Sequence, residues 1–315
     1  MSHIKRITRE LQRYNKHTTE LAERKQEQLI YYFPDEDLSN GYGLVIGPDD
    51  TPYQNCFFLV KFNYDVTYPM LEPSCKYISL SPIRQSPNLY ENGKVCLSVI
   101  NTWGKSTWKA SKGFMQVLLS IQGLVTVKNA LDCEPPYDYS SCPEKKANAH
   151  EYEEIVRFSN FKYNILKLYH KINVPVQIKE QIQEVIKDYV TKHYEWYLNA
   201  LTELNFLHQG KTYTCNIYPS THNIKMEYSE LLKEFRSFLV DDLKIPAIEV
   251  EKTVKDARKK LIKKQMTTTK VKKTFPPGPP PGSPPKIPPP DSPPASSVIS
   301  EKKVKKSKIS IKMKK

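Results

Sequence analysis

The sequence predicts an α+β fold in which one helix precedes a four-stranded antiparallel meander and several helices follow it. Three observations lead to this prediction. Apolar residues recur at helical spacing between Ile4 and Tyr14, four short β-type runs come next, and helical spacing returns from Phe114 onward. This separation of strands from helices along the chain is typical of the α+β class.

The first helix is predicted from apolar residues that recur every three or four positions: Ile4, Ile7, Leu11 and Tyr14. Basic residues occupy positions between them: Lys5, Arg6, Arg9 and Arg13. Strands are expected where β-branched and aromatic residues cluster between turn residues, at 29–33, 42–46, 56–64 and 75–79. Each strand lies close to the next in sequence, which favours antiparallel pairing of neighbours.

The later apolar patterns predict helices at 114–125, 144–172, 176–206, 224–241 and 247–264. Ser111 stands where an N-cap is expected for the first of them, because a hydroxyl can accept a hydrogen bond from a free amide there. Asn173-Val174-Pro175 divides the two longest patterns, since proline disfavours a continuing helix.

The end of the chain has a composition that cannot bury a core. Residues 276–294 contain 12 of the 25 prolines, and residues 301–315 contain eight lysines and one acid. We expect 1–205 to be a core with a helical extension, 206–265 an additional helical segment, and 266–315 a disordered tail. The proline run suits SH3- or WW-type partners, and the lysines suit anionic partners.

The net charge of +14 belongs to this end of the chain. Residues 252–315 hold 19 basic and 3 acidic residues, a balance of +16, which leaves −2 for residues 1–251. A nucleic-acid-binding face would be expected to be basic, so this distribution argues against one on the folded part.

No stretch approaches 18 consecutive apolar residues, which argues against a membrane span, and the charged start lacks the apolar region of a secretory signal. A cytoplasmic or nuclear protein is expected. The six cysteines form no C-x-x-C pair, so we expect free thiols rather than a disulfide or zinc site.

An irregular stretch, residues 81–110, separates the last expected strand from the next helix. Loops of this length are uncommon in compact domains unless they are functional. Asn88 and Cys96 stand eight residues apart within it. Asn92-Gly93 lies between them and favours a turn that would bring Cys96 towards Asn88.

These residues resemble the signature of the ubiquitin-conjugating enzymes, which is His-Pro-Asn, an Asn-Gly turn and a catalytic Cys-Leu. The corresponding residues here are Ser86-Pro87-Asn88, Asn92-Gly93 and Cys96-Leu97. Further family landmarks resemble KRITREL (5–11), GPDDTPYQ (47–54) and Tyr68-Pro69 with Pro73. The run from Asn88 to Trp103 and Glu134-Pro135-Pro136-Tyr137 are most similar to large conjugating-enzyme/ligase hybrids of the BRUCE/apollon type. The resemblance covers about residues 4–205 and leaves the role of 206–265 open.

The resemblance implies a ubiquitin-conjugating fold and a two-step thiol chemistry. Cys96 would accept ubiquitin from the activating enzyme as a thioester and pass it to a substrate lysine, because a thiolate is both nucleophile and leaving group. Asn88 would donate a hydrogen bond to the oxyanion and brace the loop. Glu134, or alternatively Asp132, would orient and activate the lysine. No metal or organic cofactor is implied, since the activating enzyme uses the ATP.

The resemblance also implies partner surfaces. Lys5, Arg6 and Arg9 coincide with the surface that the family offers to the activating enzyme, although such a basic face can simply be solvated. Phe57 or Phe58 is a candidate for a ligase-binding aromatic, and packing in the core is the other interpretation. Ser86 replaces the family histidine, so an inactive ubiquitin-conjugating-like binding module is the second functional hypothesis.

Overall fold

The computed structural model describes residues 3–124, 127, 129–131, 134 and 142–273, with side chains placed as far as residue 265. The described residues up to 267 form one compact unit, and a boundary between residues 267 and 268 separates it from the rest of the chain. The last helix, α7 (Ala247–Lys273), extends past the expected boundary at residue 265. Most of the predicted tail, residues 274–315, lies outside the described residues.

A four-stranded antiparallel meander forms the centre of the first unit, as predicted. Its strands pair in sequence order: β1 (Ile30–Pro34), β2 (Asn40–Ile46), β3 (Phe57–Asn63) and β4 (Ser74–Tyr77). In the register, Leu44 of β2 lies opposite both Tyr31 and Leu59. The two central strands are buried along nearly their whole length, which requires cover on both faces of the sheet.

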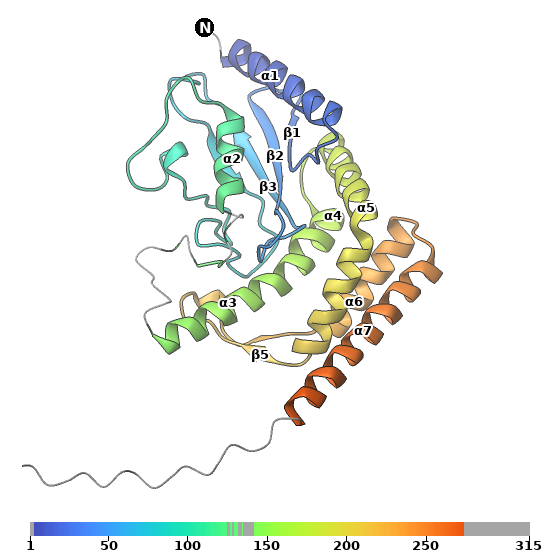
Figure 1. Ribbon diagram of the computed structural model, residues 1–315. Helices are drawn as coiled ribbons and strands as arrows, with labels where there is room; N and C mark the ends of the chain where they lie inside the picture. The colour runs from blue at the N-terminus through green and yellow to red at the C-terminus, as the bar shows by residue number, and fades with distance from the viewer. Residues whose placement is uncertain (1–2, 125–126, 128, 132–133, 135–141, 274–315) are drawn as a thin grey trace, which may run out of the picture. The chain divides into compact units, whose positions relative to one another are not determined.

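One face is covered by α2 (Phe114–Leu124), which lies in front of the sheet in Figure 1, while α1 (His3–Glu23) lies along its upper edge. Phe114 stacks on Tyr32 of β1 with ring centroids 3.9 Å apart. Tyr14 of α1 meets the same Phe114 ring edge-on at 6.0 Å. The first helix, the sheet and α2 therefore share one aromatic core.

The start of α2 is capped from α1, and not by Ser111 as predicted. The Glu10 carboxylate accepts the Phe114 amide at 3.0 Å and the Tyr68 hydroxyl at 2.7 Å. A negative charge is favourable at this end of a helix, where amides lack helical partners. A Cβ at position 113 would lie 2.3 Å from the Glu10 carboxylate, so the approach requires Gly113.

Further helices follow α2: α3 (Pro143–Phe161), the π-helical turn η2 (Lys162–Lys167), α4 (Leu168–Lys171) and α5 (Val176–His208). The helix predicted over 144–172 is thus interrupted by a π-helical turn, and α5 begins directly after Pro175 as expected. Tyr189 of α5 meets Phe57 of β3 edge-on at 5.7 Å. The Tyr197 hydroxyl donates to the Asn55 carbonyl at 2.6 Å, so α5 is held against the sheet.

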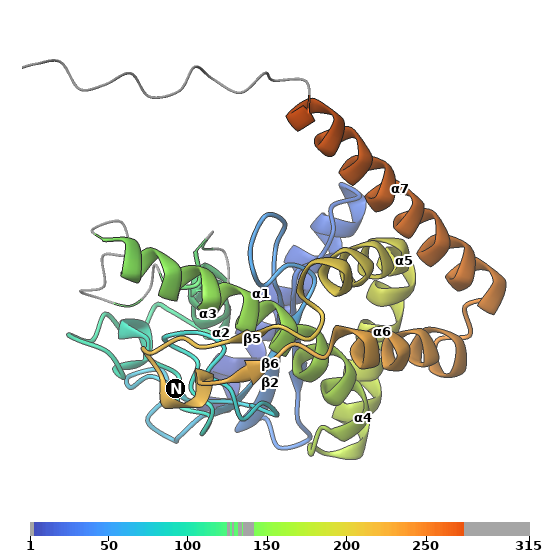
Figure 2. The same cartoon turned by 90° about the horizontal axis from the view of Figure 1, so that it is seen from below.

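The segment after α5 differs from the helix predicted over 224–241. It contains β5 (Thr212–Tyr213), the 3-10 turn η3 (Pro219–Thr221), β6 (Ile224–Lys225), α6 (Tyr228–Ser237) and the π-helical turn η4 (Phe238–Asp242). β5 and β6 form a small antiparallel sheet beside α3 (Figure 2). The helix therefore starts only at Tyr228, because residues 224 and 225 form β6 and pair with β5. Among the described helices, none combines the length and apolarity that crossing a membrane requires.

Candidate active site

Asn88 and Cys96 meet as the sequence predicts. The Cys96 amide donates to the Asn88 carbonyl at 2.9 Å, and the Asn88 side-chain amide donates to the Cys96 carbonyl at 2.9 Å. These two bonds hold the backbone of Cys96 against both the backbone and the side chain of Asn88. A carboxamide nitrogen carries two hydrogens, so one can brace the loop while the second can serve an oxyanion.

The turn between them is held by its own residues. The Asn92 side chain accepts the Lys94 amide at 3.0 Å, and Gly93 has a φ of 90°, a conformation that favours glycine. The Gly93 carbonyl accepts the Tyr77 amide of β4 at 2.8 Å. The turn that carries Cys96 is therefore tied directly to the edge of the sheet.

Ser86, which replaces the family histidine, is fully buried in this loop. Its hydroxyl accepts the Asn88 amide at 3.3 Å, and its carbonyl accepts the Leu89 amide at 3.2 Å. The substitution thus keeps a side-chain to backbone bond within the turn. Arg84 adds a further link, because its guanidinium donates to the Pro87 carbonyl at 2.5 Å and stacks 3.5 Å from the Tyr90 ring centroid.

Glu134, the expected acid, lies outside the regular elements. Its amide donates to the Leu131 carbonyl at 2.9 Å, and its carboxylate accepts a hydrogen bond from the Tyr218 hydroxyl. No sequence pattern points to Tyr218, which lies 84 residues further along the chain. Asp132, the alternative acid, lies outside the described residues.

Three of the described cysteines lie in surroundings that suppress the reactivity of their thiols. All five described cysteines are free, and Cys133 lies outside the described residues. Burial raises the pKa of the Cys56, Cys75 and Cys215 thiols, which keeps them protonated and poor nucleophiles. Cys96 is also buried, with 2% of its surface exposed.

The partner residues predicted on α1 have different environments. Lys5 and Arg9 are exposed, whereas Arg6 pairs with Glu10 and donates to the Lys112 carbonyl at 2.6 Å. Arg6 therefore also joins α1 to the segment before α2. Phe57 is not available as a ligase-binding side chain, because it is 1% exposed against α5.

Phe58 is equally buried, so the core interpretation holds for both aromatics. Exposed apolar side chains occur instead after β3, at Val66, Met70 and Leu71, and Met70 is 74% exposed. Together with the arginines of α1, this segment lines a cavity of about 460 Å³; the lining includes Arg6, Arg9, Arg13, Val66, Pro69 and Met70. We call these six residues the α1 surface. In the sequence, the apolar Met70-Leu71 pair beside prolines was the feature that could have indicated this exposed surface.

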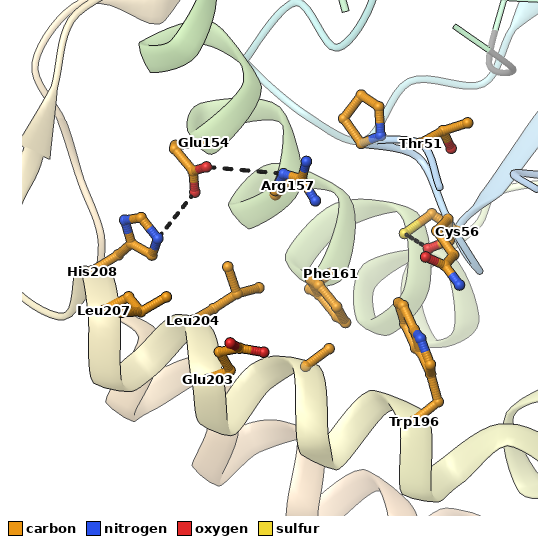
Figure 3. A pocket seen from close by; sticks show the side chains of 13 residues that line it. Thr51, Cys56, Glu154, Arg157, Phe161, Trp196, Glu203, Leu204, Leu207 and His208 are labelled. Carbon is orange, nitrogen blue, oxygen red and sulfur yellow. Dashed lines mark hydrogen bonds and ion pairs between the residues drawn. The ribbon is translucent and has the colours of Figure 1, made fainter. Parts of the chain in front are cut away.

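A different cavity, of about 280 Å³, lies between α3 and α5 (Figure 3). At one end Glu154 pairs with Arg157 at 3.9 Å and with His208 at 3.3 Å. Burial lowers the pKa of His208, so its imidazole is mainly neutral at neutral pH. The carboxylate, imidazole and guanidinium thus lie together without a strong ion pair to the histidine.

Cys56 is the thiol that lines this second cavity, and its Sγ donates to the Gln54 carbonyl at 3.4 Å. Its raised pKa makes it a poor nucleophile, so the cavity lacks the group that thioester chemistry requires. No cluster of three or more His, Cys, Asp or Glu side chains suited to a metal ion occurs within the described part of the chain.

A family model described as ubiquitin-conjugating enzyme matches residues 6–160, the span that contains the sheet, Asn88 and Cys96. This span of the chain is therefore a ubiquitin-conjugating enzyme domain. This match confirms the family that the sequence predicts. The predicted fold is confirmed as well, since the chain has an N-terminal helix, a four-stranded meander and further helices. The added segment from 206 to 265 lies beyond the family match.

Individual relatives support the same assignment. Ubiquitin-conjugating enzyme E2 Z of Danio rerio is 31% identical over 178 residues, 55% of this chain and 52% of the relative. The Homo sapiens E2 Z is 31% identical over 187 residues, 58% of this chain and 50% of the relative. The chain spans about half the length of these E2 Z relatives.

A hybrid of the kind that the sequence resembles is also similar. The dual E2 ubiquitin-conjugating enzyme/E3 ubiquitin-protein ligase BIRC6 of Homo sapiens is 36% identical over 136 residues, 39% of this chain and 3% of that protein. The E2 Z relatives therefore match a larger part of this chain than the hybrid does.

Proposed function

We propose that this chain is an active ubiquitin-conjugating enzyme that carries ubiquitin as a thioester on Cys96 and transfers it to a substrate lysine. The observation that carries the proposal is the reciprocal pair of 2.9 Å hydrogen bonds between Asn88 and Cys96, within a span that matches the family. The two bonds hold the residue that carries the thiol, Cys96, next to the residue that carries the carboxamide, Asn88.

In loading, the Cys96 thiolate attacks the carbonyl carbon of the thioester on the activating enzyme. A new carbon–sulfur bond forms, and the thiolate of the activating enzyme leaves. The chemistry needs a thiolate and a carbonyl, and the ATP is used by the activating enzyme. In this scheme the chain itself supplies side chains and no bound cofactor.

In transfer, a neutral lysine amine attacks the carbonyl of the Cys96 thioester. The Asn88 amide donates to the oxyanion, the Cys96 thiolate leaves, and an isopeptide bond remains. A lysine is mostly charged at neutral pH and must lose protons for this step. The Glu134 carboxylate is the base that orients the amine and receives the first of these protons, and the second goes to the departing Cys96 thiolate.

The α1 surface is the place where we propose that the activating enzyme, and in turn a ligase, binds. Exposed Met70 offers an apolar contact, and the arginines beside it complement an acidic partner.

For residues 274–315 we propose a role in recruitment: the prolines would bind SH3- or WW-type domains, and the lysines would bind anionic partners. Removing them should leave loading of Cys96 unchanged. A cytoplasmic or nuclear setting suits free thiols and is read directly by imaging the tagged protein.

The deciding experiment incubates the chain with activating enzyme, ATP and a panel of ubiquitin and ubiquitin-like modifiers, and resolves it on a non-reducing gel. The wild type should form an adduct that thiol reductant removes. Cys96→Ser should form an oxyester that resists reductant, and Cys96→Ala no adduct. Cys142→Ala, which changes a half-buried free cysteine, is the matched control and should load normally. A reducible adduct on Cys96→Ala would refute the assignment.

A second candidate is a ubiquitin-conjugating-like binding module without thioester activity. The observation that favours it is the 2% exposure of Cys96. The same gel separates the two candidates, because a module of this kind would bind ubiquitin in a pull-down but form no adduct with any modifier.

A further inference from the structure

The loop between β5 and β6 lies beyond the family match and is fixed by hydrogen bonds. The Cys215 amide donates to the Thr221 carbonyl at 3.1 Å, and the Thr221 hydroxyl donates back to the Cys215 carbonyl at 2.8 Å. The Thr214 amide donates to the Glu151 carboxylate of α3 at 2.5 Å. In Figure 2 the segment runs alongside α3. The loop is therefore a fixed platform on α3.

This platform meets the catalytic loop at Arg84. The Arg84 amide donates to the Ser220 hydroxyl at 3.2 Å, and its guanidinium lies 4.4 Å from the Tyr218 ring centroid. On the other side, the same guanidinium stacks on Tyr90 and donates to the Pro87 carbonyl. Arg84 thus connects the added segment with the residue immediately before Asn88.

Tyr218 contacts Arg84 and Glu134 at once. Its ring lies over the Arg84 guanidinium, and its hydroxyl donates to the Glu134 carboxylate. The side chain is almost wholly buried. Burial, together with the hydrogen bond to Glu134, raises the pKa of Tyr218, so the hydroxyl keeps its proton and remains a donor at neutral pH.

We propose that Tyr218 and Arg84 are positioning residues for the transfer of ubiquitin from Cys96 to lysine, an inference that rests on the proposed function. Tyr218 holds the Glu134 carboxylate in place for the arriving amine. Arg84 holds the Pro87 carbonyl and with it the turn that carries Asn88. A segment outside the family match thereby supports both groups that act on the incoming lysine.

The test measures single-turnover discharge of the Cys96 thioester onto free lysine across a pH series, with loading measured in parallel. Tyr218→Phe removes one hydroxyl and keeps the ring. It should slow discharge about fivefold at neutral pH, the size of one hydrogen bond, and leave loading unchanged. The deficit should shrink as pH rises, because more of the lysine is already neutral.

Two further variants separate the roles. Glu134→Gln should reproduce the pH signature of Tyr218→Phe, and the double variant should lose little more than either single one, because both act through one carboxylate. Arg84→Lys keeps the positive charge but loses the planar guanidinium group, which bonds to Pro87 and stacks on Tyr90. Because no titrating group is removed, this variant should slow discharge by the same factor at every pH. Tyr213→Phe makes the same substitution in the same segment, away from Glu134, and should behave as wild type.

The outcomes distinguish this inference from the proposed function. If the wild type loads and Tyr218→Phe discharges at the wild-type rate at every pH, the inference is wrong and the proposed function stands. If the wild type does not load, the proposed function fails. Amide hydrogen exchange of residues 84–96 then tests whether Arg84 holds the turn that carries Asn88. Faster exchange in Arg84→Lys than in the wild type supports this role of Arg84, and unchanged exchange overturns it.

Discussion

Hydrogen bonds hold the chain around Cys96, whereas aromatic rings hold the helices added after the family core. Around Cys96, Asn88 and Ser86 bond to backbone groups at 2.9–3.3 Å. Beyond that core, Phe235 of α6 lies 6.4 Å from Phe161 at the end of α3 and 5.3 Å from Tyr197 of α5, ring centroid to ring centroid. Directional bonds fix an irregular backbone, while ring packing joins regular helices through buried area.

The difference indicates how each region responds to change. The turn that holds Asn88 and Cys96 depends on a few directed bonds, so if it carries the proposed chemistry, removing one bond should affect rate more than stability. A packed aromatic cluster contributes mainly burial, so removing one ring should affect stability more than rate. Substitutions in the two regions should therefore give opposite patterns.

The largest expected effect is that of Phe235→Ala in the aromatic cluster. Phe235 is fully buried, and replacing such a ring with alanine costs about 3–5 kcal/mol in the free energy of unfolding. Denaturant unfolding should report this loss, while the loading rate of the folded fraction stays near wild type. Phe235→Leu should lose less. Lost loading with unchanged stability would contradict the division between the two regions.

Asn88→Ala should give the opposite pattern. Loss of an oxyanion donor raises a barrier by roughly 3 kcal/mol, so discharge onto lysine should slow by about a hundredfold or more. The thermal midpoint should change much less, and loading less than discharge. Asn199→Ala, on the exposed side of α5, is the control. Equal discharge rates in wild type and Asn88→Ala would make Asn88 a turn residue only.

The same contrast explains what could be predicted from the sequence. The strands and the meeting of Asn88 with Cys96 follow from local signals, which are residue period and an Asn-Gly turn. The Glu10 cap on α2 and the Tyr218 contact with Glu134 join residues 104 and 84 positions apart. Local patterns carry no information about such pairs, which tertiary packing determines.

The misplaced partner aromatic has a similar cause. Side chains alternate along β3, and Phe57 would be exposed if only one face of the sheet were covered. Tyr189 of α5 covers it from a distant part of the sequence. The exposed apolar side chains of this region, Val66, Met70 and Leu71, lie in the segment after β3, where no period indicates burial or exposure.

A smaller effect is expected from Met70→Ala on the α1 surface. If the activating enzyme docks there, losing this apolar contact should lower kcat/KM for loading by roughly fivefold, about 1 kcal/mol of contact energy. The measurement is loading at limiting activating enzyme. Ile248→Ala, an equally exposed position on α7, should leave loading unchanged. Equal losses at both positions would remove the case for a specific surface.

The smallest effect is expected at His208, the last residue of α5, which pairs with Glu154 of α3. Its pKa is lowered by burial in the folded chain, so the unfolded chain binds a proton more readily. Its contribution to stability is present above pH 6.5 and is lost as the pH falls from there through the folded pKa. His208→Gln should therefore reduce the fall in unfolding free energy on acidification. His222→Gln, at an exposed histidine, is the control.

The Glu10 carboxylate also bears on the order in which the chain is made. The helix that carries it is synthesised before the sheet and α2, and the Phe114 amide that it caps follows 104 residues later. Until then α1 has an apolar face and a carboxylate without their final neighbours. Contacts of such long sequence separation slow folding, so α1 should be synthesised well before its contact with the start of α2 can form.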